Sequence, residues 1–395
     1  MNFSRRWTDL EPIGRAASGG YRRFAWTSED SELREWFEDQ VYGLGLTLTL
    51  DRAGNQWAWW GDPDEAPGIV TGSHLDSVPD GGAFDGPLGV VSALSAVEAL
   101  KAEGFQPSRP IGVVNFGDEE GARFGVACAG SRIITGALSP ERAQSLKDTE
   151  GTSLVEAMED AGQNPDYLGR DEETLNRIGA FVELHVEQGK ALATDEYDAA
   201  IGVGTAVWPH GRWRFDFPGE ANHAGTTRLV DRDDPMLAYA STVLAARQFA
   251  AQHQAVATFG KLAVEPNGVN AIPSLVRAWL DARAPQEKDV KALLQELTAS
   301  AEEFGATVSE ESWTGNTLFD PDLAGRLSKL LDGAPLLGTG AGHDAGILAT
   351  AGISTAMLFV RNPTGKSHTP SEFAEEADCL AGVEALTTVL RELAA

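Results

Sequence analysis

Residues 72–89 read GSHLDSVPDGGAFDGPLG, and this stretch decides how the surrounding chain is interpreted. A short apolar run over 68–70 precedes it, and a long amphipathic segment over 90–101 follows it. A buried strand commonly shows as a short apolar run, and Gly and Pro interrupt regular structure. The pattern therefore predicts a strand, a Gly/Pro loop and a helix in succession.

The predicted loop carries His74, Asp76 and Asp85. A neutral imidazole and a carboxylate above the end of a strand are ligands that a divalent metal needs. Asp76 is placed to hold the imidazole of His74 from behind, because the outer partner of a metal-binding histidine is usually a carboxylate or a carbonyl. A polar surface turn explains the same residues, since DGG is ordinary turn chemistry. The choice between a metal site and a surface turn therefore depends on the patterns in other segments of the chain.

The composition is that of a soluble globular protein, with 42% hydrophobic and 23% charged residues. A length of 395 residues predicts about two to three domains. Asp and Glu number 59 against 31 Lys and Arg, which gives a net charge of −28. Such an acidic chain disfavours nucleic acid and anionic membranes as partners.

We expect a cytoplasmic protein. No stretch approaches the roughly 18 consecutive apolar residues of a membrane span, and no apolar run follows the arginines near the N-terminus as a signal peptide requires. The two cysteines, Cys128 and Cys379, are too few to staple a chain of this length and are expected to be reduced thiols.

Two further patterns lie before the decisive stretch. Residues 46–50 alternate as LTLTL, and residues 56–60 follow across the turn sequence DRAGN, so we expect a pair of strands. Apolar residues recur at helical spacing in the segment before them, which begins with a capping signal at Ser28.

Carboxylates crowd the end of a second apolar strand. The run PIGVVNF over 110–116 is followed by GDEEGARFG, which contains Asp118, Glu119 and Glu120. Three carboxylates at a buried strand end are electrostatically costly unless a cation lies beside them. A solvated loop is the alternative. Metal binding is favoured, because paired carboxylates beside a metal divide naturally into a ligand and a proton carrier.

A third apolar strand, IGAFVELHVE over 178–187, also ends in polar residues. Alternation places Glu183 and His185 on the same face, and Glu187 extends the polar stripe. A lone histidine in a strand is usually structural. His185 is better explained as a ligand, because active sites in open α/β sheets lie at the carboxyl ends of the strands.

The pattern changes near residue 201 and changes back near residue 318. Strands are expected over 204–217, 256–264 and 275–283, and helices over 235–250 and 286–304. A Gly-rich loop, an apolar strand and a final helix then follow over 338–346, 353–360 and 375–393. We therefore predict an α/β domain of residues 1–204 and 318–395, with a central mostly parallel sheet flanked by helices, and an inserted smaller α+β domain of residues 205–317.

Five of the seven histidines lie in Gly-rich or polar motifs at strand ends or loops: His74, His185, His223, His343 and His368. The other two, His210 and His253, have ordinary surroundings and receive no role. Histidines that accompany carboxylates, with no cysteine nearby, favour Zn or Mn over a thiolate site. Three histidines with Asp85 and Glu120 suffice for two metals if Asp85 bridges them.

Together these motifs resemble the hydantoinase/carbamoylase group of the M20 metallopeptidase superfamily. That group contains N-carbamoyl-L-amino acid hydrolases, allantoate amidohydrolases and β-ureidopropionases. The resemblance covers nearly the whole chain, and it rests on GSHLDSVPDGGAFDGPLGV, EEGARF, ELHVEQG, ANHAGTT, GVNAIP, LDAR, GAGHDA and GKSHTP. The peptidase and acylase branches typically carry a Trp-containing loop where this chain has DGGAF, and they do not show HVEQG.

The resemblance implies a centre of two divalent metal ions, which would be Zn or else Mn, Co or Ni. His74, Asp85 and His368 would hold one metal, and Asp85, Glu120 and His185 would hold the other. The α/β domain would be the dinuclear catalytic domain. The inserted domain would act as a lid and as the dimerisation domain of a homodimer.

The resemblance also implies roles for residues that are not ligands. Glu119 would be the general base that takes a proton from a metal-bridging water and passes it to the leaving nitrogen. The family's substrate contacts match Gln188, His223, Asn270, Arg283 and His343. Of these, His223 and His343 would also assist catalysis, and His223 would reach into the site of the partner subunit.

The implied activity is hydrolysis of the ureido C–N bond of an N-carbamoyl-L-amino acid, which releases the amino acid, CO2 and ammonia. Arg283 suits the carboxylate of such a small-molecule substrate, because guanidinium binds carboxylate in a bidentate manner. Allantoate is the near alternative, and an M20 aminoacylase or dipeptidase is a more distant one. A non-catalytic binding protein would lack a ligand or the base, and none is missing.

Two residues depart from the family pattern. Arg228 follows HAGTT where proline is usual, and Lys366 precedes the Ser-His pair. Neither is a ligand, so the implied chemistry is retained. An added cation at either place could alter the choice of substrate, which the sequence leaves open.

Overall fold

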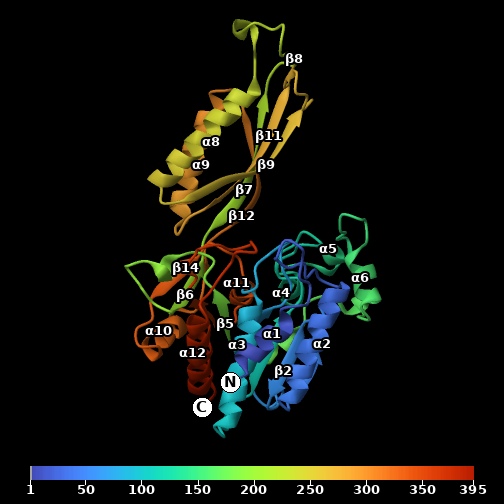
Figure 1. The fold of residues 1–395 in the computed structure, drawn as a ribbon, viewed down its shortest axis with the longest axis vertical. Coiled ribbons are helices and arrows are strands. Elements are labelled where there is room, and N and C mark those ends of the chain that lie inside the picture. Colours follow the sequence, from blue (N-terminus) through green and yellow to red (C-terminus); the bar gives the residue numbers. More distant parts are fainter. Residues whose placement is uncertain (1) are drawn as a thin grey trace. The chain divides into compact units, whose positions relative to one another are not determined.

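The structure is a computed structural model, and it describes residues 2–395. The chain forms two compact units (Figure 1). The first unit consists of the residues up to Ala206 together with Leu318–Ala395, and the second is Val207–Thr317. Among the described residues, no helix combines the length and the apolar character that crossing a membrane requires.

A nine-stranded sheet forms the centre of the first unit, with the order β1-β2-β4-β3-β5-β15-β6-β13 and β14 beside β6. The strands are β1 (Thr47–Leu50), β2 (Gln56–Trp60), β3 (Gly68–His74), β4 (Ile111–Phe116), β5 (Ile178–Val186), β6 (Ile201–Val207), β13 (Thr317–Leu318), β14 (Leu336–Thr339) and β15 (Thr355–Val360). The central strands β4, β3, β5 and β15 are parallel. Antiparallel pairings, β1–β2, β2–β4 and β15–β6, flank them.

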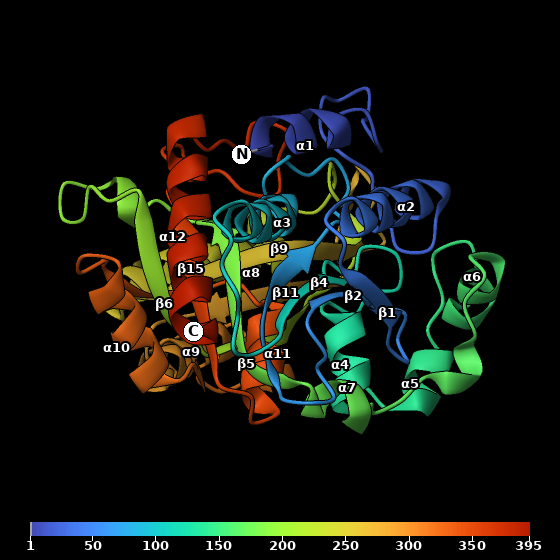
Figure 2. The ribbon, with the colours of Figure 1, turned by 90° about the horizontal axis from the view of Figure 1, so that it is seen from below.

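Helices cover both faces of this sheet (Figure 2). The helices of this unit are α1 (Phe3–Leu10), α2 (Ser28–Gly43), α3 (Pro87–Ala102), α4 (Ala129–Thr135), α5 (Pro140–Gln144), α6 (Leu154–Asp160), α7 (Glu172–Asn176), α10 (Pro321–Leu330), α11 (Asp344–Thr350) and α12 (Glu376–Ala394). Of these, α5 and α6 pack on each other rather than on the sheet. Alternation along β5 explains the division, because Val182, Leu184 and Val186 join the apolar core with α3 and α12. The residues between them face α11, where the backbone N–H of Ala345 donates to Glu183. The expected α/β fold with a helix-flanked, mostly parallel sheet is confirmed.

The second unit is an antiparallel sheet with two helices packed on one face. The sheet has the order β12-β7-β11-β9, and a short pair, β10-β8, lies beyond it. Its elements are β7 (His210–Pro218), β8 (Asn222–His223), α8 (Pro235–Gln252), β9 (Val256–Glu265), β10 (Ala271–Ile272), β11 (Leu275–Arg283), α9 (Glu287–Glu302) and β12 (Thr307–Thr314). Alternate residues of β7 and β11, including Phe215 and Val276, are fully buried against apolar residues of α9. The period-2 pattern therefore gives the sheet one covered face.

A hydrogen-bond network connects the turn between β1 and β2 to the end of β4. The carboxylate of Asp51 accepts hydrogen bonds from the Asn55 side chain at 2.7 Å and from Trp57 Nε1 at 2.8 Å. The Asn55 side-chain oxygen in turn accepts from the backbone N–H of Gly117 at 2.8 Å. Gly117 directly precedes Asp118, Glu119 and Glu120, so this network fixes the start of the acidic loop.

Replacing Asp51 with Ala should lower the free energy of unfolding by about 2–4 kcal/mol, because the Asn55 and Trp57 donors lose their acceptor while they remain enclosed. Denaturant titration of metal-free protein measures this loss. Asp51→Asn keeps one acceptor oxygen and should lose less. Asp9→Ala, which removes an exposed carboxylate on α1, is the control. A loss of less than about 0.5 kcal/mol for Asp51→Ala would show that the network is dispensable.

Candidate metal centre

Three parallel strands bring the predicted ligands to one edge of the sheet. The order β4-β3-β5 makes these strands neighbours, so their carboxyl ends lie side by side. His74 is the last residue of β3, and His185 is the penultimate residue of β5. Glu119 and Glu120 follow β4 within four residues. The position of all four side chains thus follows from strand pairing.

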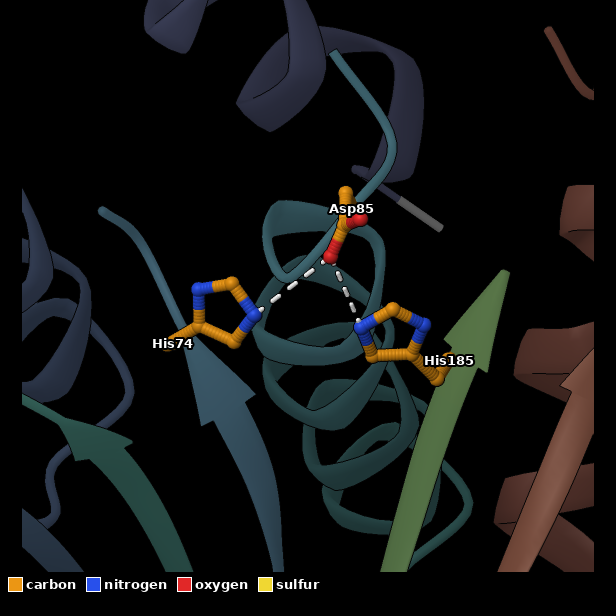
Figure 3. Close-up of side chains that lie close together, drawn as sticks. All are labelled: His74, Asp85 and His185. Carbon is orange, nitrogen blue, oxygen red and sulfur yellow. Dashed lines mark ion pairs between the residues drawn. The ribbon is translucent and has the colours of Figure 1, made fainter. Parts of the chain in front are cut away.

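The two histidines converge on one oxygen of Asp85, which lies in the loop before α3 (Figure 3). His185 Nε2 is 3.1 Å from Asp85 Oδ1, and His74 Nε2 is 3.6 Å from the same oxygen. All three residues are buried. Gly86 has φ +83°, and a Cβ there would lie 2.4 Å from the His74 ring. Glycine therefore allows the Asp85 loop to pass directly over this imidazole.

The outer nitrogens of both rings face oxygen atoms. His74 Nδ1 lies 3.2 Å from the Asp76 carbonyl, and His185 Nδ1 lies 2.9 Å from the Val186 carbonyl. A proton on each Nδ1 leaves a lone pair on each Nε2. Both Nε2 atoms are buried and have no hydrogen-bond partner among residues 2–395. Lone pairs that face a carboxylate repel it unless a cation lies between them, so this donor set fits a divalent metal.

The pKa of His74 leads to the same conclusion. Burial opposes a charge on this ring, but Glu119, Asp76 and Asp85 outweigh burial and raise the pKa well above its usual range. Without a metal, a proton is therefore retained at this position. A metal ion would displace that proton and supply the positive charge that the carboxylates require.

A second group of ligand atoms lies on the other oxygen of Asp85. His368 Nε2 is 3.4 Å from Asp85 Oδ2 and 3.7 Å from Glu120 Oε2. Asp85 therefore belongs to both groups, one with His74 and His185 and one with Glu120 and His368. This grouping differs from the division that the resemblance implied, which placed His368 beside His74 and His185 beside Glu120. Neighbouring strands direct both buried histidines to Oδ1, whereas two loops bring His368 to Oδ2 and Glu120 to His368.

Asp76 lies behind the centre and is buried. Its Oδ1 is 3.3 Å from His74 Nδ1. Its two oxygens also accept the backbone N–H groups of Glu119 at 3.1 Å and of Glu120 at 3.0 Å. One carboxylate thus orients the imidazole and fixes the acidic loop at the same time, which is the arrangement typical of groups behind a metal ligand.

Glu119 is buried beside the ligands and belongs to neither ligand group. Its Oε2 is 3.7 Å from His74 Nε2, and its Oε1 accepts the Cys128 thiol at 3.3 Å. Burial raises the pKa of Glu119 well above its usual range; His74 opposes the shift, and Asp344 and Glu120 add to it. A carboxyl group that holds a proton close to the ligands is suited to general acid–base work. No local pattern around Cys128 predicts its contact with this residue.

Several other carboxyl groups crowd the same region. Burial raises the pKa of Glu120 to about 7, and Asp85 adds to this shift. Burial also raises the pKa of Asp344 to about 8, and Glu183 adds to it. Both shifts show that the ionised form is disfavoured, because the carboxyl groups are buried and lie close to other negative charges. Bound divalent cations would reverse that imbalance.

Gln188 and His343 also lie beside the centre. Gln188 Nε2 donates to Asp85 Oδ2 at 2.7 Å and to Ser367 Oγ at 3.1 Å. The His343 ring is buried with its centroid 4.5 Å from that of His185, and its Nε2 has no partner among the residues described. Burial, together with His185, lowers the pKa of His343 well below its usual range, so this ring is neutral.

The remaining predicted residues lie in the second unit. His223 is exposed, and its Nδ1 accepts backbone N–H groups from Gly225 at 3.0 Å and Thr226 at 3.2 Å. Its proton is therefore on Nε2, which makes that exposed nitrogen a hydrogen-bond donor. The carbonyl of Asn270 accepts the Ala224 N–H beside it.

Arg283 ends β11 in the second unit. It forms a two-point ion pair with Asp281, at 2.7 Å and 2.9 Å. The planar guanidinium is thus held in one orientation by a neighbour on the same strand.

Comparisons with known proteins agree with this geometry. The model of the peptidase family M20/M25/M40 matches residues 70–392. The chain is 36% identical to an N-carbamoyl-L-amino acid amidohydrolase of Geobacillus stearothermophilus, over 98% of this chain and 97% of that protein. It is 31% identical to an allantoate amidohydrolase of Escherichia coli (strain K12), over 98% and 96%.

A solved structure is similar as well. A hydantoinase/carbamoylase family amidase from Burkholderia multivorans superposes with a TM-score of 0.88 at 30% identity, over 100% of this chain and 97% of that one. The family match covers most of the chain and includes every ligand-type residue of the centre. The chain therefore belongs to the peptidase family M20/M25/M40.

Proposed function

We propose that the chain is a metal-dependent amidohydrolase that cleaves the ureido C–N bond of an N-carbamoyl-L-amino acid. The observation that carries this proposal is the shared carboxylate of Asp85, with imidazole nitrogens of His74 and His185 on one oxygen and His368 on the other, beside the buried acid Glu119. The relative from Geobacillus stearothermophilus supports the substrate class. Members of the M20 family bind divalent metals, and we propose two per chain, Zn or Mn, Co or Ni.

The residues around Asp85 would have separate roles in the reaction. Divalent ions held there would lower the pKa of a nearby water and stabilise negative charge on the substrate oxygen. Glu119 would take the proton from the attacking water and deliver it to the nitrogen that leaves. Water adds to the ureido carbon and the C–N bond to the nitrogen of the amino acid breaks, which releases the amino acid and a carbamate. The carbamate then decomposes to ammonia and CO2. His343, which is neutral, would bind the substrate next to His185.

The second unit would supply the groups that recognise the substrate. Arg283, held by Asp281, would bind the substrate carboxylate in a bidentate manner. His223 would donate its Nε2 proton to the oxygen that becomes negative, and Asn270 lies beside it in the β8–β10 pair. In the first unit, Gln188 would connect the substrate to Asp85.

We further propose a homodimer in which His223 serves the site of the partner subunit. Leu229 and Val230, which follow His223 closely along the chain, are 82% and 84% exposed, and Val269, which precedes the strand β10 that pairs with β8, is 107% exposed. Such exposure is unusual for apolar residues. Leu237 and Leu244, seven residues apart on α8, are also exposed, and β9 is an edge strand of the sheet. A second copy of the chain would cover these surfaces.

Purified protein reloaded with Zn²⁺ or Mn²⁺ should release ammonia from N-carbamoyl-L-amino acids. We expect kcat/KM for the best of these to exceed that for allantoate by at least about tenfold, since a tenfold ratio needs only ~1.4 kcal/mol of differential binding. N-acetyl amino acids and dipeptides serve as control substrates. Higher kcat/KM on allantoate would select the allantoate amidohydrolase alternative, which the relative from Escherichia coli supports. Preference for an N-acetyl amino acid or a dipeptide would overturn the ureido assignment.

Glu119→Gln should lower kcat by at least about 100-fold, the usual scale for loss of a general base, while both metals stay bound. Glu120→Gln should instead lower the metal content from two ions per chain to one. Elemental analysis after reloading and dialysis measures both. If Glu119→Gln loses a metal and Glu120→Gln keeps two, base and ligand have been exchanged in our assignment.

His223→Ala should lower kcat by about 100- to 1,000-fold, because an oxyanion donor is lost. Mixed in equal amounts with Glu119→Gln chains, it should recover about one quarter of wild-type activity, since half of the dimers are mixed and each has one complete site. His253→Ala, in which a surface histidine paired with Glu296 is removed, is the control. Absence of recovery after verified subunit exchange would mean that His223 acts within its own chain.

A further inference from the structure

The turn that carries His368 also carries a buried carboxylate that the chemistry above does not use. Glu372 follows His368 by four residues, and its backbone N–H donates to the Thr369 carbonyl at 3.0 Å, which closes the turn. The Glu372 side chain is 5% exposed. Its Oε2 accepts the backbone N–H of Phe84 at 2.9 Å and that of Asp85 at 3.0 Å. One oxygen thus binds two successive amides of the loop that presents Asp85.

The loop is shaped to receive this oxygen. A Cβ at Gly82 would lie 2.3 Å from Glu372 Oε2, so only glycine leaves room for the carboxylate. Phe84 packs against Phe373 with the ring centroids 6.2 Å apart, and against Trp7 on its other side at 4.9 Å. The contact between the two segments therefore combines a polar bond with apolar packing, across 287 positions of the chain.

The turn that carries His368 and Glu372 contacts Asp85 at two places. Glu372 holds its main chain, and His368 Nε2 lies 3.4 Å from its side-chain Oδ2. A backbone held at this point fixes the rotation of the Asp85 carboxylate, which must present one oxygen to His74 and His185 and the other to His368. A small rotation would break the sharing, because the ligand distances of a metal centre tolerate only a few tenths of an ångström.

We infer that Glu372 is a positioning residue: it orients Asp85 for metal binding through the two main-chain amides, and it acts as a hydrogen-bond acceptor rather than as a charge. The other oxygen, Oε1, is buried and has no hydrogen-bond partner among residues 2–395. The geometry therefore requires one acceptor oxygen only, which a glutamine would also supply. The inference rests on the proposed metal centre and is independent of which substrate is cleaved.

The test compares Glu372→Leu, which has similar volume and no acceptor, with Glu372→Gln, which keeps one. Co²⁺ is titrated into metal-free protein, and its visible absorption and the number of ions bound are recorded without substrate. In Glu372→Leu, the more weakly bound of the two Co²⁺ ions should have an affinity about 10- to 100-fold lower than in the wild type. That is the usual effect of losing a group behind a metal ligand. Glu372→Gln should stay within about threefold of the wild type, and kcat on the best substrate should follow the same order. Glu375→Leu, which removes an exposed carboxylate three residues further on, should match the wild type.

Three results would overturn the inference. If Glu372→Leu binds Co²⁺ with wild-type affinity, the acceptor is not needed. If both Glu372 variants lose affinity equally, the charge of the carboxylate is what matters. If the wild-type chain binds no Co²⁺, there is no metal centre for Glu372 to position. If Glu372→Leu does not fold, Gly82→Ala provides the second variant. Its added Cβ should displace the Glu372 oxygen and weaken Co²⁺ binding similarly. Weakened Co²⁺ binding together with an inactive wild type would support the inference while refuting the proposed ureido activity.

Discussion

The buried carboxylate of Asp85 is the point on which the catalytic unit depends. Groups from four distant segments face it: the ends of β3 and β5, the acidic loop after β4, and the turn before α12. A carboxylate in such a position has little solvent to stabilise its charge. The surrounding architecture can be understood as a means of holding several anionic groups and imidazole rings close together, with positive charge to be supplied by metal ions. Asp76 serves this end by orienting the His74 imidazole and by fixing the main-chain amides of Glu119 and Glu120, and the Asp51 network serves it by fixing the amide of Gly117.

Much of this could be predicted from the sequence, because the informative patterns are local. An apolar strand followed by His74, another followed by Glu119 and Glu120, and a third ending at His185 indicate ligands at strand ends. Parallel strands place those ends at the same edge of the sheet. The helix-flanked sheet and the presence of an α+β insertion follow from similar local periods.

What could not be predicted depends on contacts between distant segments. The division of ligands between the two oxygens of Asp85 follows from β3 and β5 being neighbours and from the approach of the loop that carries His368. Neither is encoded near the residues concerned, so the grouping of ligand atoms in the structure differs from the division that the resemblance implied. The contacts of Glu372 with the Asp85 loop and of Cys128 with Glu119 were missed for the same reason. A glutamate in SEF and a cysteine in ACAG have no local feature that marks them.

The way in which the insertion joins the first unit has a consequence for how the protein is made. The chain leaves β6 and returns at β13, which belong to the same sheet, and the Phe319 N–H donates to the Thr205 carbonyl at 3.0 Å. The insertion is one continuous segment, so it can fold as soon as it leaves the ribosome. The catalytic sheet cannot, because β15 lies between β5 and β6 and is synthesised after the entire insertion. While more than a hundred further residues are synthesised, the edges of β5 and β6 that later bind β15 therefore remain unpaired. Unpaired strand edges of this kind are the surface that a chaperone would protect during synthesis.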